Sequence, residues 1–141
     1  MSSEKLFVDS STIIYGIEYP KSNSALVLRL IRDRKISAAT SQKVLEEVKN
    51  FLTLKHGENF AFRTQNFMAQ NFKIVPRNEI KHELLQFEGK IKEKDLEHLA
   101  TAKKLGLKII AFDRDFKPFK EYMTPKELVQ KLGLKGFDTD Y

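Results

Sequence analysis

The chain contains no cysteine and no tryptophan, and none of its apolar runs is long. Without cysteine it can form neither a disulfide nor a thiolate metal site. No run approaches the ~20 apolar residues of a membrane-spanning helix, and residues 1–5 lack the hydrophobic segment of a signal peptide. These absences predict a cytoplasmic protein with no membrane partner.

The size and composition of the chain predict one globular domain. Its 141 residues are 41% hydrophobic and 11% aromatic, without a long polar tract. A chain of this length can bury more than half of the surface that it exposes when unfolded, so folding needs no disulfide or metal. We expect a single domain over residues 1–141, with a flexible tail at residues 136–141.

The chain is basic, because 25 Lys and Arg residues face 19 Asp and Glu residues, which gives a net charge of +6. A basic surface attracts polyanions such as RNA, but the same charge also favours solubility. Charge alone therefore leaves both interpretations open. The residues that could form a basic rim are Lys43, Lys49, Arg63, Lys73, Arg77, Lys117 and Lys120.

Short apolar stretches alternate with helical patterns along the whole chain. Strands are expected at residues 6–8, 36–39, 72–75 and 108–112, with a brief extended piece at 122–123. Helices are expected at residues 24–31, around 59–69, and at 96–105 and 125–132. Gly106 is expected to end the helix 96–105, and Thr124 is expected to cap the last helix with Glu127 three residues on. This alternation predicts an α/β fold with a parallel sheet covered by helices on both faces and a ligand site at the carboxyl ends of the strands.

Two further helices follow from capping residues and apolar stripes. Thr40 or Ser41 is expected to cap a helix, and Asn78 to cap another. The inner faces of these two helices are predicted from the spacing of Val44, Val48, Phe51, Leu52 and Lys55, and of Ile80, Leu84, Phe87 and Ile91. The segment 24–31 is apolar almost all round, so it is either a buried helix or a contact with a second protein molecule.

Four acidic residues lie where an apolar stretch meets a helix or a loop: Asp9, Glu47, Asp95 and Asp113. Two carboxylates about 4 Å apart repel each other by roughly 4 kcal/mol at an effective dielectric near 20. A divalent cation among them would remove this cost, and carboxylate oxygens suit Mg²⁺ or Mn²⁺. Taken singly, each acid also fits a helix cap, a turn or a solvated surface charge.

The sequence around these acids resembles the successive acidic motifs of the PIN-domain nucleases. The four motifs that carry the resemblance are residues 7–11, 41–48, 95–102 and 111–116. The third, an Asp followed by the small-residue stretch Ala100, Thr101 and Ala102, is the most specific. The resemblance implies a three-layer α/β domain in which Asp9, Glu47, Asp95 and Asp113 are catalytic, metal-binding acids, with Asp115 as an auxiliary ligand.

Some positions depart from the pattern of that family. Members often have Thr and then Asn after the first acid, where this chain has Ser10 and Ser11. We expect Ser11 to orient Asp9 or a metal-bound water. Ala111 stands where many members carry a hydroxyl. Arg114 is expected either to contact a substrate phosphate or to form a salt bridge in the turn, and His98 is expected to be a packing or supporting residue.

The resemblance implies hydrolysis of RNA phosphodiester bonds with Mg²⁺ or Mn²⁺, most specifically by the toxin of a VapBC-like pair. A small antitoxin protein and a homodimer are the implied protein partners. Two alternatives stay open: an RNA-processing nuclease that is not a toxin, and a non-catalytic module that binds RNA or protein. A phosphoacceptor function is disfavoured, because Ser11 occupies the position where a haloacid-dehalogenase-like site needs a second Asp.

Overall fold

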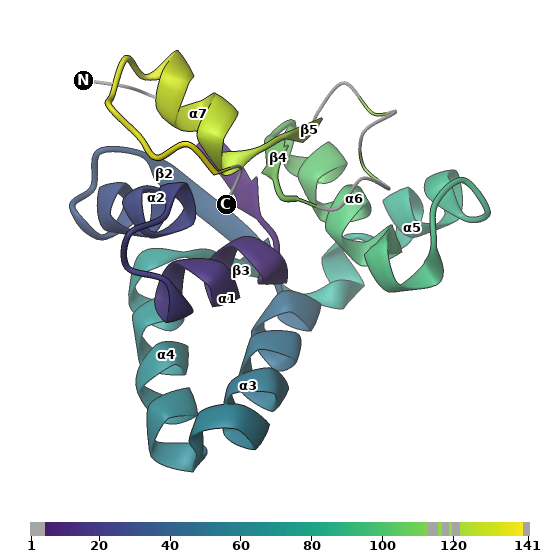
Figure 1. Cartoon of the computed structure of the whole chain (residues 1–141). Coiled ribbons are helices and arrows are strands. Elements are labelled where there is room, and N and C mark those ends of the chain that lie inside the picture. The colour runs from purple at the N-terminus through teal and green to yellow at the C-terminus, as the bar shows by residue number, and fades with distance from the viewer. Residues whose placement is uncertain (1–4, 113–115, 117–118, 120–121, 140–141) are drawn as a thin grey trace.

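A five-stranded parallel sheet forms the centre of the molecule (Figure 1). The computed structural model describes residues 5–112, 116, 119 and 122–139, apart from the side chains of Glu93 and Lys94. In spatial order the strands are β3 (Lys73–Val75), β2 (Ser37–Ser41), β1 (Lys5–Val8), β4 (Lys108–Ile110) and β5 (Tyr122–Met123), and every neighbouring pair is parallel. The predicted α/β fold with a central parallel sheet flanked by helices is confirmed.

Helices surround this sheet. They are α1 (Ser10–Glu18), α2 (Asn23–Arg32), α3 (Gln42–His56), α4 (Glu58–Asn71), α5 (Lys81–Phe87), α6 (Glu93–Leu105) and α7 (Pro125–Lys131), with a short 3₁₀ turn, η1 (Arg77–Glu79). Helix α6 packs on β1, β2 and β4, and α2 lies between α1 and α7. Helices α3 and α4 form a hairpin that extends away from the sheet (Figure 1). Within the described residues no helix has the length and apolarity needed to cross a membrane.

The strand order reverses beside β1. The chain runs from β1 outward through β2 to β3, then returns to the other side of β1 to form β4 and β5. Val8 at the end of β1 is in register with Ile110 at the end of β4. In open α/β sheets ligands bind at such a reversal, outside the carboxyl ends of the strands. The first acid of the sequence, Asp9, follows β1 directly at this point.

The central strands and α2 supply much of the core. Phe7, Val8 and Ile109 are fully buried, as expected for strands covered by helices on both faces. Helix α2 buries Val27 and Ile31 in the same cluster. Of the two interpretations of segment 24–31, the structure therefore supports the buried helix.

Three sequence predictions are corrected by the helix boundaries. Asn78 does not cap a helix: it lies inside η1, and α5 begins only at Lys81 and ends before Ile91. The chain closes a 3₁₀ turn after Pro76, in which the Ile80 amide donates to the Arg77 carbonyl, and this delays the helix. Helix α6 begins at Glu93 rather than at residue 96, so Asp95 is its third residue and does not precede it.

Fewer residues of α3 are buried than the spacing of its apolar residues predicted. Val44, Val48 and Leu52 are buried, whereas Phe51 is 39% exposed and Lys55 is exposed. Phe51 and Lys55 stand one turn apart on the same side of the hairpin and contact each other, with the Lys55 Nζ atom 5.4 Å from the ring centroid. The long stem of a lysine can cover an aromatic face in this way while its charge stays in water.

Other local predictions are confirmed. Ser41 caps α3 by accepting a hydrogen bond from the Val44 amide, and Thr124 forms a full capping box with Glu127. Gly106 ends α6 in the left-handed conformation, with φ of 66°. The Asn23 side chain hydrogen-bonds with the backbone of Phe137 and Thr139. Flexibility of residues 136–141 stays a prediction.

A close contact between α1 and α2 at Gly16 gives a first test of the fold. A Cβ at Gly16 would lie 2.5 Å from Leu28 Cδ1 and 3.0 Å from the backbone carbon of Ser24. In an open helix Gly→Ala stabilises, by up to about 1 kcal/mol. Here we expect Gly16→Ala to destabilise the protein by about 1–3 kcal/mol, the usual cost of overpacking. Urea unfolding measures this change, and an unchanged or higher midpoint contradicts the close packing.

An ion-pair cluster joins the end of α1 to the end of α3. Glu18 Oε2 lies 2.8 Å from Lys55 Nζ and 3.0 Å from His56 Nε2. The hydrogen bond from Lys55 is the main cause of a lowered Glu18 pKa, and partial burial opposes it. A carboxyl with a lowered pKa in the folded state stabilises the fold above its unfolded pKa, and this stabilisation is lost as the pH falls through the folded pKa.

We therefore expect Glu18→Gln to lower the thermal midpoint near pH 7, where Glu18 is charged in the wild type. At a pH below the folded pKa of Glu18 both forms are neutral, so the two midpoints should converge as the pH is lowered. Glu88→Gln, at an exposed position after α5, is the matched control and should leave the midpoint unchanged. A Glu18→Gln deficit that keeps the same size as the pH is lowered would show that charge is not the cause.

Candidate metal centre

Asp9 is the most buried of the predicted acids that the structure describes. It caps α1, and its Oδ1 atom accepts hydrogen bonds from the Ser11 hydroxyl (2.8 Å) and the Thr12 amide (3.2 Å). Burial raises the pKa of the Asp9 carboxyl; nearby His98 and the bonds from Ser11 and Thr12 only partly offset this. The fold thus holds an oriented carboxylate in a place where its negative charge is poorly solvated.

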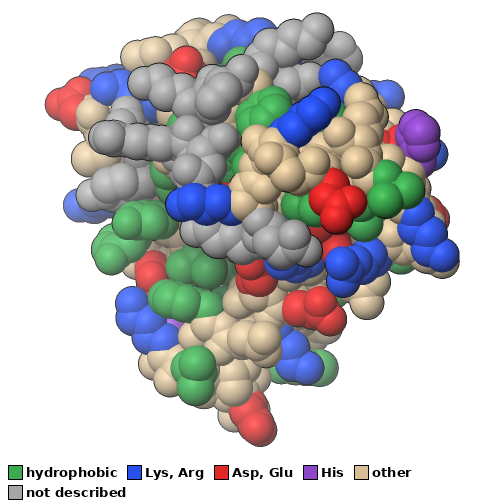
Figure 2. All heavy atoms as spheres, turned by 90° about the vertical axis from the view of Figure 1, so that its right-hand side faces the viewer, with side chains coloured by type: hydrophobic (Ala, Val, Ile, Leu, Met, Phe, Trp, Pro, Cys, Tyr) green, Lys and Arg blue, Asp and Glu red, His purple; other side chains and the backbone are tan. Residues whose placement is uncertain are grey.

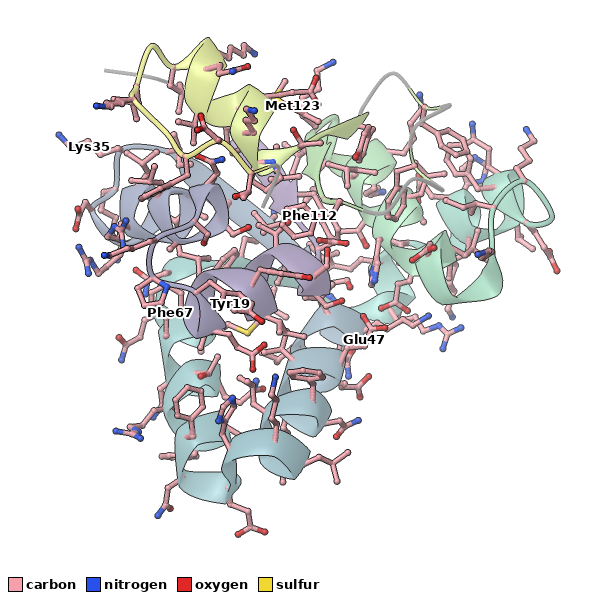
Figure 3. The ribbon with its side chains drawn as sticks, in the orientation of Figure 1. Tyr19, Lys35, Glu47, Phe67, Phe112 and Met123 are labelled. Carbon is pink, nitrogen blue, oxygen red and sulfur yellow. The ribbon has the colours of Figure 1, made fainter. Side chains whose placement is uncertain are left out.

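Glu47 approaches from the second turn of α3. Its Oε1 atom lies 3.1 Å from His98 Nε2 on α6, and its side chain is 37% exposed. Figure 3 labels Glu47 on the side of α3 toward α6. Burial acts to raise the Glu47 pKa, but His98, Lys43 and a hydrogen bond from Ser10 outweigh it, so the pKa is lowered. Glu47 is therefore held ionised, whereas the charge of Asp9 is disfavoured.

His98 links these two acids. The buried imidazole is packed between Phe7 and Phe116, with ring centroids 5.8 Å and 6.5 Å away, and it interacts electrostatically with Asp9 as well as with Glu47. This is the supporting position that the sequence suggested for it. Asp95 stands one turn before His98 on α6 and is also buried. Its place in the first turn puts it at the positive end of the helix dipole.

Asp113, Arg114 and Asp115 lie outside the described residues. The last two residues described before them are Ala111 and Phe112, which follow β4. The Ala111 amide donates to the Met123 carbonyl, and the Phe112 ring packs on Tyr15. The Asp9 amide donates to the Ile110 carbonyl, so the ends of β1 and β4 are joined. In the sequence, Asp113 thus follows the strand that pairs with β1 next to Asp9.

The donor chemistry of this edge fits a hard divalent cation. Its acids offer oxygen ligands, and a bound cation would favour the ionised form of Asp9 that burial disfavours. Over the part of the chain that the structure describes, no three acidic or histidine side chains are grouped closely enough to hold one metal ion. Asp9 and Glu47 both interact with His98, and Asp95 lies one turn before His98 on α6, but the described residues do not by themselves form a closed ligand shell.

Glu97 is a buried acid that the sequence interpretation did not single out. Its Oε2 atom accepts a hydrogen bond from the Lys43 amide at 3.0 Å, and its Oε1 atom lies 3.4 Å from Arg77 Nε. One signal was available: Ala100 and Thr101, three and four residues on, are small and buried, so Glu97 lies on the same inward face of the helix. Of the proposed basic rim, Lys43 and Arg77 thus lie beside this centre.

Two buried threonines at the strand ends were also missed. The Thr12 hydroxyl donates to the Ile110 carbonyl at 3.0 Å, and the Thr40 hydroxyl donates to the Val8 carbonyl at 2.8 Å. They satisfy backbone oxygens at the carboxyl ends of β4 and β1. Such hydroxyls keep the floor of the site in place without taking part in its charge.

The family follows from this fold and from a direct match. A model of the PIN domain matches residues 6–121, most of the chain. The fold and the match define the class: the chain belongs to the PIN-domain family. A sequence comparison with curated proteins finds no match.

Solved structures of toxins share the fold. A toxin–antitoxin complex from Klebsiella pneumoniae has 21% identity and a TM-score of 0.64, covering 85% of this chain and 97% of that chain. VapBC-1 from nontypeable Haemophilus influenzae has 13% identity and a TM-score of 0.66, covering 86% and 98%. The sarcin-ricin loop cleaving toxin VapC20 from Mycobacterium tuberculosis has 18% identity and a TM-score of 0.62, covering 82% and 95%. The chain is thus a PIN-domain protein with a fold like that of VapC toxins.

The burial of Asp9 predicts that its charge destabilises the metal-free protein. We expect Asp9→Asn to raise the unfolding midpoint in metal-free buffer near pH 7, because asparagine caps a helix equally well and carries no charge to desolvate. Since folding raises the Asp9 pKa, wild-type stability falls as the pH rises from the unfolded toward the folded pKa, and the gap to the variant widens over that interval.

Urea unfolding near pH 3 and near pH 7 measures this gap. Asp33→Asn is the matched control, because Asp33 is exposed and its pKa is lowered by Arg32, so this variant should gain no stability near pH 7. An Asp9→Asn midpoint below that of the wild type near pH 7 would show that the carboxylate is well stabilised without a cation.

Proposed function

We propose that the protein is a divalent-metal-dependent endoribonuclease that hydrolyses RNA phosphodiester bonds. The observation that carries the proposal is that Asp9 and Glu47 both interact with His98, one turn after Asp95 on α6, beside the strand reversal of a PIN domain. Asp113, which follows β4 in the sequence, completes the proposed catalytic set, with Asp115 as an auxiliary ligand. The net charge of +6 supports a polyanionic substrate.

The residues of the chain would hold Mg²⁺ or Mn²⁺ through carboxylate oxygens. When bound, such a metal polarises the scissile phosphate and makes a bound water a nucleophile near neutral pH. Ser11 and Thr12 fix the orientation of Asp9, and the contact with His98 fixes Glu47. Arg114, next to Asp113, is proposed to contact a substrate phosphate. The ionised Glu47 is able to accept a proton at this edge.

We further propose that the protein is the toxin of a VapBC-like pair, neutralised by a small antitoxin. The support is the fold shared with solved toxin–antitoxin complexes, among them one from Rickettsia felis, VapBC2, which was crystallised with promoter DNA (16% identity, TM-score 0.60). A homodimer belongs to the same proposal. An RNA-processing nuclease would have the same catalytic centre. The neighbouring open reading frame distinguishes the two, because a small protein with a DNA-binding N-terminus encoded there would favour the toxin.

The direct test is cleavage of single-stranded and structured RNA with Mn²⁺, with Mg²⁺ and with a chelator. We expect the protein to cleave RNA only when the metal is present. The cleavage rate should fall by at least about 100-fold in Asp9→Asn, Glu47→Gln and Asp95→Asn, because metal catalysis supplies several kcal/mol and each 1.36 kcal/mol is tenfold in rate. Asp33→Asn removes an exposed acid away from the centre and should cleave at the wild-type rate.

Calorimetric titration with Mn²⁺ separates a nuclease from a non-catalytic module. The proposal expects binding by the wild type and by Asp33→Asn, and weakened binding by Asp9→Asn. RNA binding without Mn²⁺ binding would favour the non-catalytic module. Metal-stimulated cleavage that survives all three substitutions of the centre would point to a contaminating nuclease and remove the basis of the assignment.

A further inference from the structure

A pocket of about 490 Å³ opens beside the candidate metal centre, between the start of α3, η1, α5 and α6. Its polar lining includes Lys43, Arg77 and Glu97, and its apolar lining is Leu84 and Leu96. The volume is in the range of sites that bind small molecules. Leu96 follows Asp95 directly on α6, and Glu46, also in the lining, precedes Glu47 on α3. The pocket is therefore next to the proposed ligands on two helices.

Glu97 is unusual among the residues that line this pocket, because it is only 4% exposed and yet borders a solvent-accessible space. The Lys43 amide uses one acceptor position of Oε2, and Arg77 lies at the long distance of 3.4 Å from Oε1. A carboxylate has about four acceptor positions, two on each oxygen. Glu97 thus keeps acceptor capacity on both oxygens while the Lys43 amide holds it in place.

The charges around the pocket argue against a simple phosphate site. The negative Glu46 and Glu97 match the positive Lys43 and Arg77 in number. Figure 2, which faces the α5 and α6 side of the molecule, shows acidic and basic side chains intermixed rather than a continuous basic surface. A carboxylate at the wall repels a phosphate group but attracts N–H donors. The ligand that fits has donors on one edge and apolar faces.

We propose that this pocket binds a guanine base of the RNA substrate, next to the scissile phosphate. Guanine is the one standard RNA base that presents two adjacent N–H donors, N1–H and the N2 amino group, and these match the two oxygens of Glu97. Leu84 and Leu96 offer apolar surface to the base, and the exposed Arg77 can move aside or contact the adjoining phosphate. Single-stranded RNA is read through such unstacked base edges.

This inference rests on the proposed ribonuclease function and adds base specificity to it. The test is cleavage of an RNA with a randomised single-stranded segment, followed by sequencing of the product ends. We expect guanine to be enriched about tenfold or more at one fixed position beside the cut, the discrimination that one bidentate base contact provides. Glu97→Gln should remove the enrichment, since it replaces one acceptor oxygen with a donor but keeps an oxygen for the Lys43 amide.

Glu88→Gln, an exposed acid outside the pocket, is the matched control and should keep the enrichment. A second measurement needs no variant: the wild type should bind an oligonucleotide with guanine at the preferred position more tightly than one with inosine there, because inosine lacks the N2 amino group. Binding is measured by fluorescence anisotropy. If the wild type does not cleave RNA, no preferred position is known, and the comparison uses oligonucleotides with guanine or inosine at every position. Circular dichroism and urea unfolding establish that Glu97→Gln is folded.

The outcomes separate the two proposals. Cleavage without guanine enrichment, or enrichment that persists in folded Glu97→Gln, overturns the guanine pocket and leaves the ribonuclease proposal standing. Absence of metal-dependent cleavage by the wild type overturns the ribonuclease proposal, and the binding comparison then decides the pocket. Equal affinity for the guanine and inosine oligonucleotides rejects the pocket in either case.

Discussion

The parallel pairing of β1 with both β2 and β4 is the constraint on which the rest of the structure depends. It places the end of β1 at the centre of the sheet edge, where the strand order reverses. From there the chain must enter α1 at Asp9, and the helices that follow β2 and precede β4 bring Glu47 and Asp95 to the same edge. Acids separated by tens of residues in sequence thus become neighbours because of the strand order.

The buried charge of Asp9 opposes the stability of the fold. Burial raises the pKa of Asp9, so the charged carboxylate destabilises the folded state. His98 and Ser10, in contrast, keep Glu47 ionised. A neutral capping residue such as asparagine at position 9 would fold more easily. Local destabilisation of this kind is common at functional sites, where the unfavourable term is relieved by a ligand. A cation is the ligand that would relieve negative charge.

Sequence patterns predicted the features that depend on local chemistry. Buried strands such as 6–8, the Ser41 cap, the Thr124 capping box and the Gly106 helix end follow from short-range rules, and the structure confirms them. The start of α5 was mispredicted, because Asn78 is a good cap in isolation but Pro76 leads the chain into a 3₁₀ turn first. Contacts across the chain, such as Glu97 with the Lys43 amide, have no short-range signal and needed the fold.

Two buried acids two residues apart on α6 illustrate why residue type alone does not define a site. Asp95 lies in the first turn, one turn before His98, which interacts with both Asp9 and Glu47. Glu97 is rotated by about 200° along the helix and turns instead toward the start of α3 and Arg77. One acid therefore belongs with the proposed metal ligands and the other with the wall of the adjoining pocket. Residues 95–97, near the start of α6, thereby contribute to both functions that we propose, catalysis and recognition of the base beside the cut.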